Sequence, residues 1–306
     1  MKLQQIRAFV EIVRRDLSVS DAAQALFTSQ PGLSHHIRKF EEELRSELFI
    51  RRGKRIIKLT NVGQEVLAIS QRILAEAENL RRVASESQNE AEGDLVVATT
   101  HTQAHYTLPN VVRAFIAKHP KVRLGIKPCS PMEAADMVRR GEANLCISTE
   151  VVGTMSELVM IPGEKWTRCV ITPPKHPLLY THPLELEAIQ KYPLITYDFA
   201  FQKNSKIRNA FEAKGLIPRV VLTSADTGII KTHVSAGLGI GLIASIAYNK
   251  SEDKDLRKLD ASHLFESSMT TIGLHKNSYL TGYIYDFIQL VFPRVKRRAV
   301  EALFTG

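Results

Sequence analysis

A run of hydrogen-bonding side chains follows the apolar residues 95–98, namely Thr99, Thr100, His101, Thr102 and Gln103. If residues 95–98 form a buried strand and a helix follows, the turn between them presents backbone N–H groups and the positive end of a helix dipole, which together bind anions. Hydroxyl and amide donors without a neighbouring Lys or Arg suit a small oxyanion held by neutral hydrogen bonds. Thr100, Thr102 and Gln103 are therefore candidate anion ligands, although the segment alone is equally compatible with a polar loop that caps its own helix.

Thr149 occupies an equivalent position after a second apolar run, residues 145–147. Ligands of open α/β sheets bind beyond the carboxyl ends of the strands. We therefore expect Thr149 to lie at the same sheet edge as the threonine-rich turn and to contribute a further hydroxyl to an anion site.

A second polar group lies on one face of a predicted helix that begins near Ser29. Ser29 is a suitable N-cap, and Pro31 is tolerated only in a first turn. The buried face of this helix consists of Leu33, Ile37, Phe40 and Leu44. A DNA-recognition helix presents short polar and basic groups to the major groove from its N-terminal end. The candidate DNA-binding residues of this helix are Ser29, Gln30, Pro31, Ser34, His35 and Arg38.

A basic tip follows this helix, between the short apolar runs 48–50 and 56–59. Two such runs around a Gly-containing tip predict a small hairpin. The basic residues of the tip are Arg51, Arg52, Lys54 and Arg55, and we expect them to contact DNA phosphates. Residues 1–60 contain 12 basic and 7 acidic residues, and the excess is mainly in this tip. A helical bundle with a solvated basic loop is the alternative, but the combination of capped short helix, turn, second helix and basic hairpin favours DNA binding.

The elements around these sites follow from hydrophobic periodicity. An apolar stripe predicts a helix over residues 3–13, and Ser18 with Asp21 predicts the start of a short helix through Leu26. Thr60 is expected to cap a long helix over residues 61–87, and its apolar stripe favours a two-helix coiled coil. The positions of that stripe are Val62, Val66, Ile69, Ile73, Leu74, Leu80 and Val83.

Strands and helices alternate after Gly93, which is typical of α/β units on mostly parallel sheets. The expected strands are residues 95–98, 122–126, 145–147, 170–171 and 194–195, and the expected helices are residues 108–118 and 132–140. The chain is therefore predicted to be multidomain: a winged helix-turn-helix over residues 1–60, a linker helix and hinge over 61–92, and an α/β domain over 93–306.

Composition narrows the function classes. The net charge of +9 favours a polyanionic partner, and the odd number of cysteines without a C-x-x-C pair argues against a disulfide framework or a cysteine zinc site. The N-terminal segment is an amphipathic helix rather than a signal peptide, and the most apolar stretch, residues 234–248, contains three glycines and is too short to span a bilayer. We therefore expect a cytoplasmic protein.

The sequence contains no recognisable catalytic or cofactor-binding motif. There is no G-x-S-x-G motif, and neither the pair His35 and His36 nor the pair His101 and His105 has a metal-binding context. The glycine-rich segment 237–241 follows a predicted helix and is interpreted as a helix-to-strand turn rather than a dinucleotide loop. We expect no enzymatic activity, no cofactor and no metal.

Residues 1–87 resemble the N-terminal domain and linker helix of LysR-type transcriptional regulators. The likeness is carried by the Ala22-Ala23 pair, the segment 27–34, Ile37-Arg38-x-x-Glu41 and Leu48-Phe49-x-Arg51. The rest of the chain is similar to the sulfur-assimilation branch of that family, which controls the cysteine regulon and sulfonate use. The segments that carry this closer match are 98–104, 108–109, 230–232 and 285–289.

The resemblance implies a homotetrameric activator that binds promoter DNA, acts with RNA polymerase and senses an effector in a domain of periplasmic-binding-protein type II. The chain would cross between two subdomains near Glu164 and Ser267, which gives subdomain I about residues 93–164 and 267–306 and subdomain II about residues 165–266. Effectors of this branch are sulfate, thiosulfate or acylserines. The positions that match its effector ligands are Thr100, Thr102, Gln103, Thr149 and Gln202, the last of which stands where a threonine is expected.

Two other classes of protein remain as alternatives. A stand-alone small-anion solute-binding protein would explain the α/β domain but not the N-terminal DNA-binding pattern, and a signal peptide is missing. An enzyme built on the α/β domain would need a nucleophile with a base, or a metal constellation, that the sequence does not offer.

Overall fold

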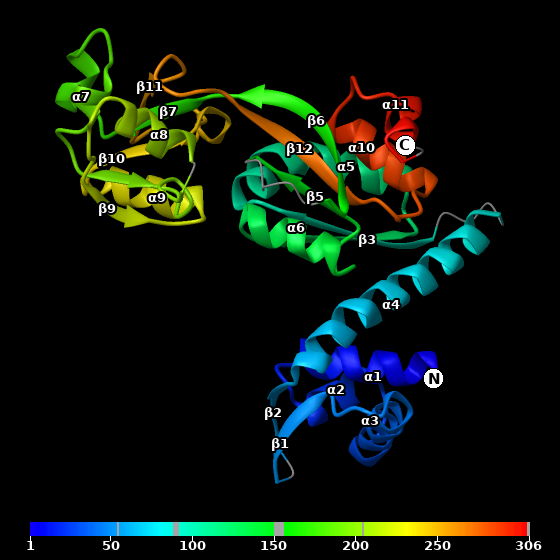
Figure 1. Ribbon diagram of the computed structural model, residues 1–306. Coiled ribbons are helices and arrows are strands. Elements are labelled where there is room, and N and C mark those ends of the chain that lie inside the picture. Colours follow the sequence, from blue (N-terminus) through cyan, green and yellow to red (C-terminus); the bar gives the residue numbers. More distant parts are fainter. Residues whose placement is uncertain (54, 88–91, 150–155, 204, 305–306) are drawn as a thin grey trace. The chain divides into compact units, whose positions relative to one another are not determined.

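The computed structural model describes residues 1–53, 55–87, 92–149, 156–203 and 205–304 (Figure 1). The chain divides into two compact units, residues 1–90 and 91–306. Lys54, one of the expected phosphate contacts, lies outside the described residues. The elements of the first unit are α1 (Leu3–Arg14), α2 (Val19–Ala25), α3 (Gln30–Leu44), β1 (Phe49–Arg52), β2 (Arg55–Leu59) and α4 (Asn61–Ser87).

Side-chain caps set the starts of three helices in the first unit, as the sequence predicts. The hydroxyl of Ser18 accepts a hydrogen bond from the backbone N–H of Asp21 at 3.3 Å, and the hydroxyl of Ser29 accepts one from Gly32 at 3.2 Å. Thr60 accepts the N–H of Gly63 at 2.8 Å, at the start of the long helix α4. Each cap satisfies an N–H group that has no partner within its helix.

The core of the first unit fixes helix α3 against α1 and the hairpin. The ring of Phe9 lies 5.8 Å from the ring of Phe40 and 5.2 Å from the ring of Phe49, between centroids, and all three rings are buried. Strands β1 and β2 pair antiparallel, and Gly53 adopts a positive φ of 62° at the tip between them. The predicted hairpin is therefore confirmed as a wing, and its Phe49 packs against Phe9 of α1.

Helix α4 does not present a single uninterrupted apolar stripe. Val66, Ile73 and Leu74 pack against the core of the first unit, because α4 contacts α1. Only part of the apolar stripe is therefore available to a second helix. The stripe positions that remain exposed are Val62, Ile69, Leu80 and Val83.

The second unit contains two sheets. The elements around the first sheet are β3 (Gly93–Thr99), η1 (Gln103–Thr107), α5 (Leu108–Lys118), β4 (Val122–Pro128), α6 (Pro131–Arg139), β5 (Leu145–Ser148), β6 (Leu158–Trp166), β12 (Ser268–His275), α10 (Gly282–Val291) and α11 (Arg297–Ala302). Those around the second sheet are β7 (Arg168–Thr172), η2 (Pro177–Tyr180), α7 (Leu186–Ile189), β8 (Leu194–Thr196), α8 (Lys206–Ala213), β9 (Val220–Thr223), α9 (Thr227–Ser235), β10 (Ile240–Ala244), η3 (Ser245–Ala247) and β11 (Arg257–Asp260).

The first sheet has the strand order β4-β3-β5-β12-β6 and the second β11-β7-β10-β8-β9. In each sheet three adjacent strands, including one edge strand, are parallel: β4, β3 and β5 in the first, and β10, β8 and β9 in the second. We call residues 93–166 and 268–304 the first subdomain and residues 168–260 the second subdomain. The chain passes from one to the other between β6 and β7 and returns between β11 and β12 (Figure 1).

Each subdomain has its own buried core.

Close backbone packing explains the glycines of segment 237–241. Gly237 ends helix α9 with a φ of 80°, which favours glycine. A Cβ on Gly239 would lie 2.3 Å from the carbonyl oxygen of Pro193, and one on Gly241 would lie 2.6 Å from the side chain of Ile171. The segment is the helix-to-strand turn that the sequence predicts, since β10 begins at Ile240.

Candidate functional site

The polar candidates of helix α3 form one exposed surface of the first unit. Leu33, Ile37 and Phe40 are buried on the opposite side of the helix, so the 3.6-residue period leaves the other side to solvent. The residues on this exposed surface are Ser29, Gln30, Pro31, Ser34, His35 and Arg38. The structure thus brings together all the residues that the sequence assigned to this helix.

Glu41 joins helix α3 to the wing. Its buried carboxylate accepts the backbone N–H groups of Leu48 and Phe49 through Oε1, at 2.9 and 3.3 Å, and its Oε2 lies 2.8 Å from Nη2 of Arg51. Arg51 is therefore engaged within the protein at the base of the wing. Arg52 and Arg55 are exposed further along the wing, where they are accessible to phosphates.

Phe27 is a surface feature that the sequence did not single out. Its side chain is 98% exposed, and its backbone has a positive φ of 51° in the turn between α2 and α3. This exposed apolar side chain is two residues before Ser29, the cap of α3. No periodic pattern marks a single turn residue, which is why sequence reasoning passed over it.

A cavity in the second unit collects most of the expected effector ligands. Its empty volume is about 410 Å³, including space open to solvent. The first subdomain contributes Thr100, His101, Thr102, Gln103, Cys129, Ser130, Thr149 and Trp166. Thr100 follows β3, Ser130 follows β4 and Thr149 follows β5, so the carboxyl ends of three parallel strands meet at this cavity.

Ser130 and Cys129 were missed by the sequence reasoning, although the argument that found Thr149 applies to them. The strand before them was predicted at residues 122–126, and it pairs parallel with β3. Ser130 is also the N-cap of α6, where its hydroxyl accepts the N–H of Glu133 at 3.3 Å. The N-terminus of α6 therefore begins at the cavity and contributes its positive dipole end there.

The second subdomain closes the other side of the cavity. It contributes Tyr197, Phe199, Ala225, Ala244 and Ile246. Gln202, which was expected to reach across to the effector, is exposed and is not among the lining residues. Among the described lining residues of this subdomain, the polar one is Tyr197, which follows β8. Nothing in the sequence distinguished it from other buried aromatics.

Three buried hydroxyl groups link the two subdomains at the edge of this cavity. Thr102 Oγ1 lies 3.3 Å from the hydroxyl of Tyr197 and 3.1 Å from Oγ1 of Thr227, and the latter two oxygens are 3.0 Å apart. The Tyr197 hydroxyl also accepts the N–H of Ala244 at 3.2 Å. Thr102 thus contacts the opposite subdomain, while Thr100 and Thr149 face the cavity from the first.

Polar atoms at the cavity have unused hydrogen-bonding capacity. Among the residues that the structure describes, Gln103 Oε1 and Trp166 Nε1 are buried without a hydrogen-bond partner. The amide nitrogen of Gln103 donates to Thr270 at 3.4 Å. Trp166 Nε1 is a donor and can bind an acceptor atom of a ligand, whereas Gln103 Oε1 is an acceptor that only a donor could satisfy.

The protonation states of Cys129 and Tyr197 are compatible with a negatively charged ligand. Burial, and to a smaller extent Glu133, raise the pKa of the Cys129 thiol to about 11. Burial also raises the pKa of Tyr197, despite its hydrogen bonds with Thr102 and Thr227. Both groups are therefore neutral near pH 7 and do not repel an anion.

Other classes of site are not visible in the described residues. Within them, no group of three or more His, Cys, Asp or Glu side chains is placed to hold a metal ion. No helix in the described part of the chain combines the length and the apolar character needed to cross a membrane.

Comparison with known proteins matches both units. Residues 3–64 match the family described as bacterial regulatory helix-turn-helix protein, lysR family, and residues 88–295 match the LysR substrate binding domain. The chain is 44% identical over 303 residues to the HTH-type transcriptional regulator SsuR of Burkholderia cenocepacia, with 99% of this chain and 98% of the relative covered. It is 42% identical over 306 residues to the HTH-type transcriptional regulator CysB of the same organism, with 100% and 98% covered.

Among solved structures, the cofactor-binding domain of the Cbl transcriptional regulator is similar to the second unit. The TM-score is 0.66 at 37% sequence identity, and the match covers 70% of this chain and 93% of that one.

Proposed function

Since the chain belongs to the LysR family of bacterial transcriptional regulators, we propose that its first unit binds promoter DNA and that its second unit binds a small sulfur-pathway anion which changes that binding. Members of this family are regulators rather than enzymes, and they respond to small-molecule effectors. The observation that carries the proposal is the cavity between the subdomains, whose polar lining is made of hydroxyl, amide, imidazole and indole groups.

The chemistry of this lining favours an oxyanion. Of the residues that the structure describes around the cavity, none is Lys or Arg. A sulfate-like ion has acceptors on all sides and no donors, so hydroxyls, backbone N–H groups and a helix N-terminus can hold it without a buried cation. We assign Thr100, Gln103 and Thr149 as direct ligands and Thr102 as a ligand that exchanges its partners in the second subdomain for the anion. Sulfate, thiosulfate and acylserines are the effectors to test first, because the full-length relatives include CysB and SsuR.

We assign different roles in DNA binding to the exposed residues of the first unit. Gln30, Ser34 and His35 lie on the first turns of α3 and are assigned to base contacts in the major groove. Arg52 and Arg55 are assigned to phosphates. Arg51 is assigned to the position of the wing, because it is paired with Glu41.

We further propose that α4 forms the dimer contact and that two dimers assemble into a tetramer that acts with RNA polymerase in the cytoplasm. The exposed apolar residues Ile69, Leu80 and Val83 support the dimer, since a second copy of α4 would remove them from water.

The experiment that tests the effector assignment is a thermal-shift screen of sulfate, thiosulfate, alkanesulfonates and acylserines on the full chain. A ligand that binds only the folded state raises the melting temperature with concentration. At least one of these anions should do so, and the rise should be smaller in Thr100→Val. Equal melting temperatures with every anion would refute the assignment.

A further inference from the structure

Two contacts one turn apart join the two subdomains beside the cavity. Thr102 and Tyr106 are four residues apart at helix η1 of the first subdomain, and Thr227 and Lys231 are four residues apart on α9 of the second. Thr102 Oγ1 lies 3.1 Å from Thr227 Oγ1, and Lys231 Nζ lies 4.9 Å from the centroid of the Tyr106 ring. The same two elements are thus connected twice, once through hydroxyls and once through a cation and an aromatic ring.

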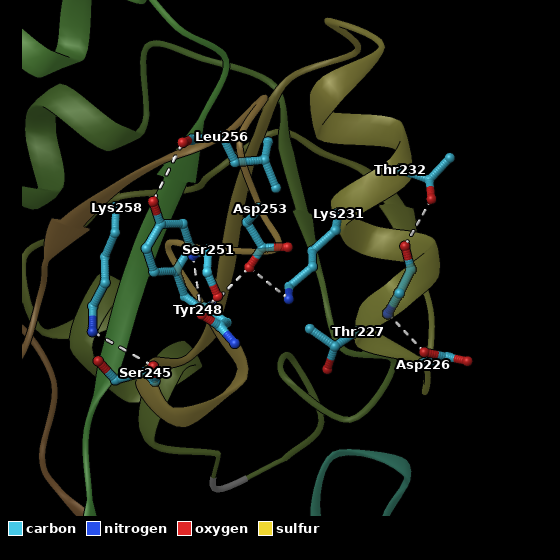
Figure 2. Close-up of polar contacts among 12 residues, drawn as sticks. Asp226, Thr227, Lys231, Thr232, Ser245, Tyr248, Ser251, Asp253, Leu256 and Lys258 are labelled. Carbon is cyan, nitrogen blue, oxygen red and sulfur yellow. Dashed lines mark hydrogen bonds and ion pairs between the residues drawn. The ribbon is translucent and has the colours of Figure 1, made fainter. Parts of the chain in front are cut away.

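The ammonium group of Lys231 is held in place by its own subdomain. Figure 2 shows Lys231 extending from α9 toward Asp253, which lies in the loop between η3 and β11. Lys231 Nζ is 2.8 Å from Asp253 Oδ2, and these side chains are only 12% and 11% exposed. The same carboxylate oxygen accepts the backbone N–H of Asn249 at 2.8 Å, which fixes the carboxylate in turn.

Tyr106 belongs to the first subdomain but packs against the second. Its ring contacts the hydrophobic core built around β7, β8 and β10, and it covers the ammonium group of Lys231. Burial lowers the pKa of Lys231, but Asp253 and Tyr106 outweigh that effect and raise it above its ordinary value of 10.5, so the group is charged. A charged ammonium over the face of an aromatic ring is an attractive arrangement that strengthens where water is excluded.

We propose that Tyr106 and Lys231 form a latch that holds the two subdomains together and positions Thr102 and Gln103 at the cavity. Helix η1 has the wide π-helical turn, and this single turn carries Gln103 to the cavity and Tyr106 to Lys231. Tyr106 and Lys231 are positioning residues, since neither lines the cavity. The consequence for regulation rests on the proposed function: a ligand that engages Thr102 and Gln103 acts on the same turn that carries the latch.

The size of the contact suits a reversible latch. A cation–π contact that is partly removed from water is strong enough to shift a ratio of open to closed molecules by about fivefold. A shift of this size changes the population of a state competent to bind effector without locking the cavity shut. The hydroxyl contact of Thr102 and Thr227 adds to it on the same two elements.

The chain contains a reporter for this latch. Trp166 is its single tryptophan, and it lines the cavity at the end of β6, where the chain leaves the first subdomain. Acrylamide quenching of its fluorescence measures access to the cavity, and it can be recorded on the full chain without any effector. Tyr106→Leu removes the ring face from the ammonium group and should raise the quenching constant about twofold, as the open population grows. Tyr106→Phe keeps the ring face but removes the phenolic oxygen that also interacts with Lys231, so its quenching constant should lie between those of wild type and Tyr106→Leu.

Matched variants separate opening from unfolding. Lys231→Met alone leaves the nearly buried Asp253 without its cation, so it is combined with Asp253→Asn, and the double variant should reproduce the quenching of Tyr106→Leu. Tyr180→Leu changes an exposed tyrosine of the second subdomain, and Lys214→Met breaks the exposed pair of Lys214 with Glu187; both should leave the quenching unchanged. Circular dichroism melting checks that each variant is folded.

The outcomes are distinct. Quenching in folded Tyr106→Leu and in the double variant that equals that of wild type would overturn the latch. A latch that opens as expected, in a protein whose quenching and melting temperature sulfate, thiosulfate and acylserines all leave unchanged, would support the latch and contradict the proposed anion binding.

Discussion

Nη2 of Arg51 lies 2.8 Å from Oε2 of Glu41, so the base of the wing is fixed to the recognition helix. The same carboxylate also accepts two backbone N–H groups of the segment that leads into the wing. This buried acid thus ties the wing to α3, in addition to the packing of Phe49 in the core. Truncating Arg51 leaves the carboxylate of Glu41 without its cation. The expected result is a loss of stability rather than the loss of a phosphate contact.

Arg51→Ala should lower the free energy of unfolding of the first unit by about 1–3 kcal/mol, because a charged hydrogen bond to a buried carboxylate is lost. The double variant Arg52→Ala, Arg55→Ala should keep the free energy of unfolding of wild type. It should bind all DNA sequences more weakly, by about the same factor, and the plot of log affinity against log salt should be flatter by about one unit of slope per lost contact. Urea denaturation and binding titrations at several salt concentrations measure the two effects. Loss of affinity confined to one cognate sequence in the double variant would rule out phosphate contacts.

Gln30→Ala should relax sequence discrimination by roughly 1–3 kcal/mol at one position in each half-site, because a bidentate amide contact to a base is removed. Gln30 is exposed at the first position of α3, so the change should not affect folding. Binding to a set of single-base variants of the site measures the discrimination. If wild type and variant rank all of them identically, Gln30 does not read bases.

Ile69→Glu and Ile73→Glu should differ, because the structure places the two side chains in different surroundings. Ile69 is 48% exposed, whereas Ile73 packs on the core of the first unit. Ile69→Glu should keep the melting temperature of the protomer and dissociate the dimer, since it places a charge in the proposed α4 contact. Ile73→Glu should instead destabilise the first unit by several kcal/mol. Sedimentation velocity and thermal melts separate these effects, and a native mass for Ile69→Glu would exclude α4 as the dimer contact.

Asp286 should make the free energy of unfolding depend on pH in the acid range. Burial raises the pKa of Asp286, but hydrogen bonds from Lys118 and His119 outweigh this and hold it below its ordinary value of 3.8. A carboxyl with a lower pKa in the folded state stabilises the fold above the unfolded value, and that stabilisation is lost as the pH falls through the folded value. Asp286→Asn should therefore cost about 1 kcal/mol near neutral pH and progressively less below about pH 4. Urea denaturation across this range would contradict the assignment if the difference stayed constant.

Local features of the sequence predicted much of this structure. The caps Ser18, Ser29 and Thr60 are satisfied by groups three residues away, so each helix start can be read from a short segment. Thr100 and Thr149 were found because parallel strands end at a common edge. The same rule would have found Ser130.

Contacts between distant segments could not be predicted in this way. Tyr106 and Lys231 meet only because two subdomains are folded against each other, and no period in the sequence connects them. The placement of Gln202 likewise depends on the path of the loop after β8, which directs Tyr197 rather than Gln202 toward the cavity. The partial burial of the α4 stripe depends on how the first turns of that helix pack on α1.

Thr100 and Gln202 should contribute differently to anion affinity, because only Thr100 lines the cavity. Thr100→Val keeps the shape of the side chain and removes one donor, so anion affinity should fall about ten- to a hundred-fold. Gln202→Thr, at an exposed position outside the cavity lining, should leave anion affinity unchanged. Calorimetry with sulfate and with an acylserine compares the two, and a larger loss in Gln202→Thr than in Thr100→Val would move the ligand toward the loop after β8.

Control of DNA binding by an anion in the cavity can be measured in one titration. The full chain is bound to a fluorescent DNA fragment that it has selected from a random pool, and sulfate, thiosulfate or an acylserine is added while anisotropy and the protected sequence are recorded. At least one anion should change the affinity or the protected region in wild type, and Thr100→Val should need about ten- to a hundred-fold more of it for the same change. DNA complexes that none of these anions alters, or an equal response in wild type and Thr100→Val, would contradict it.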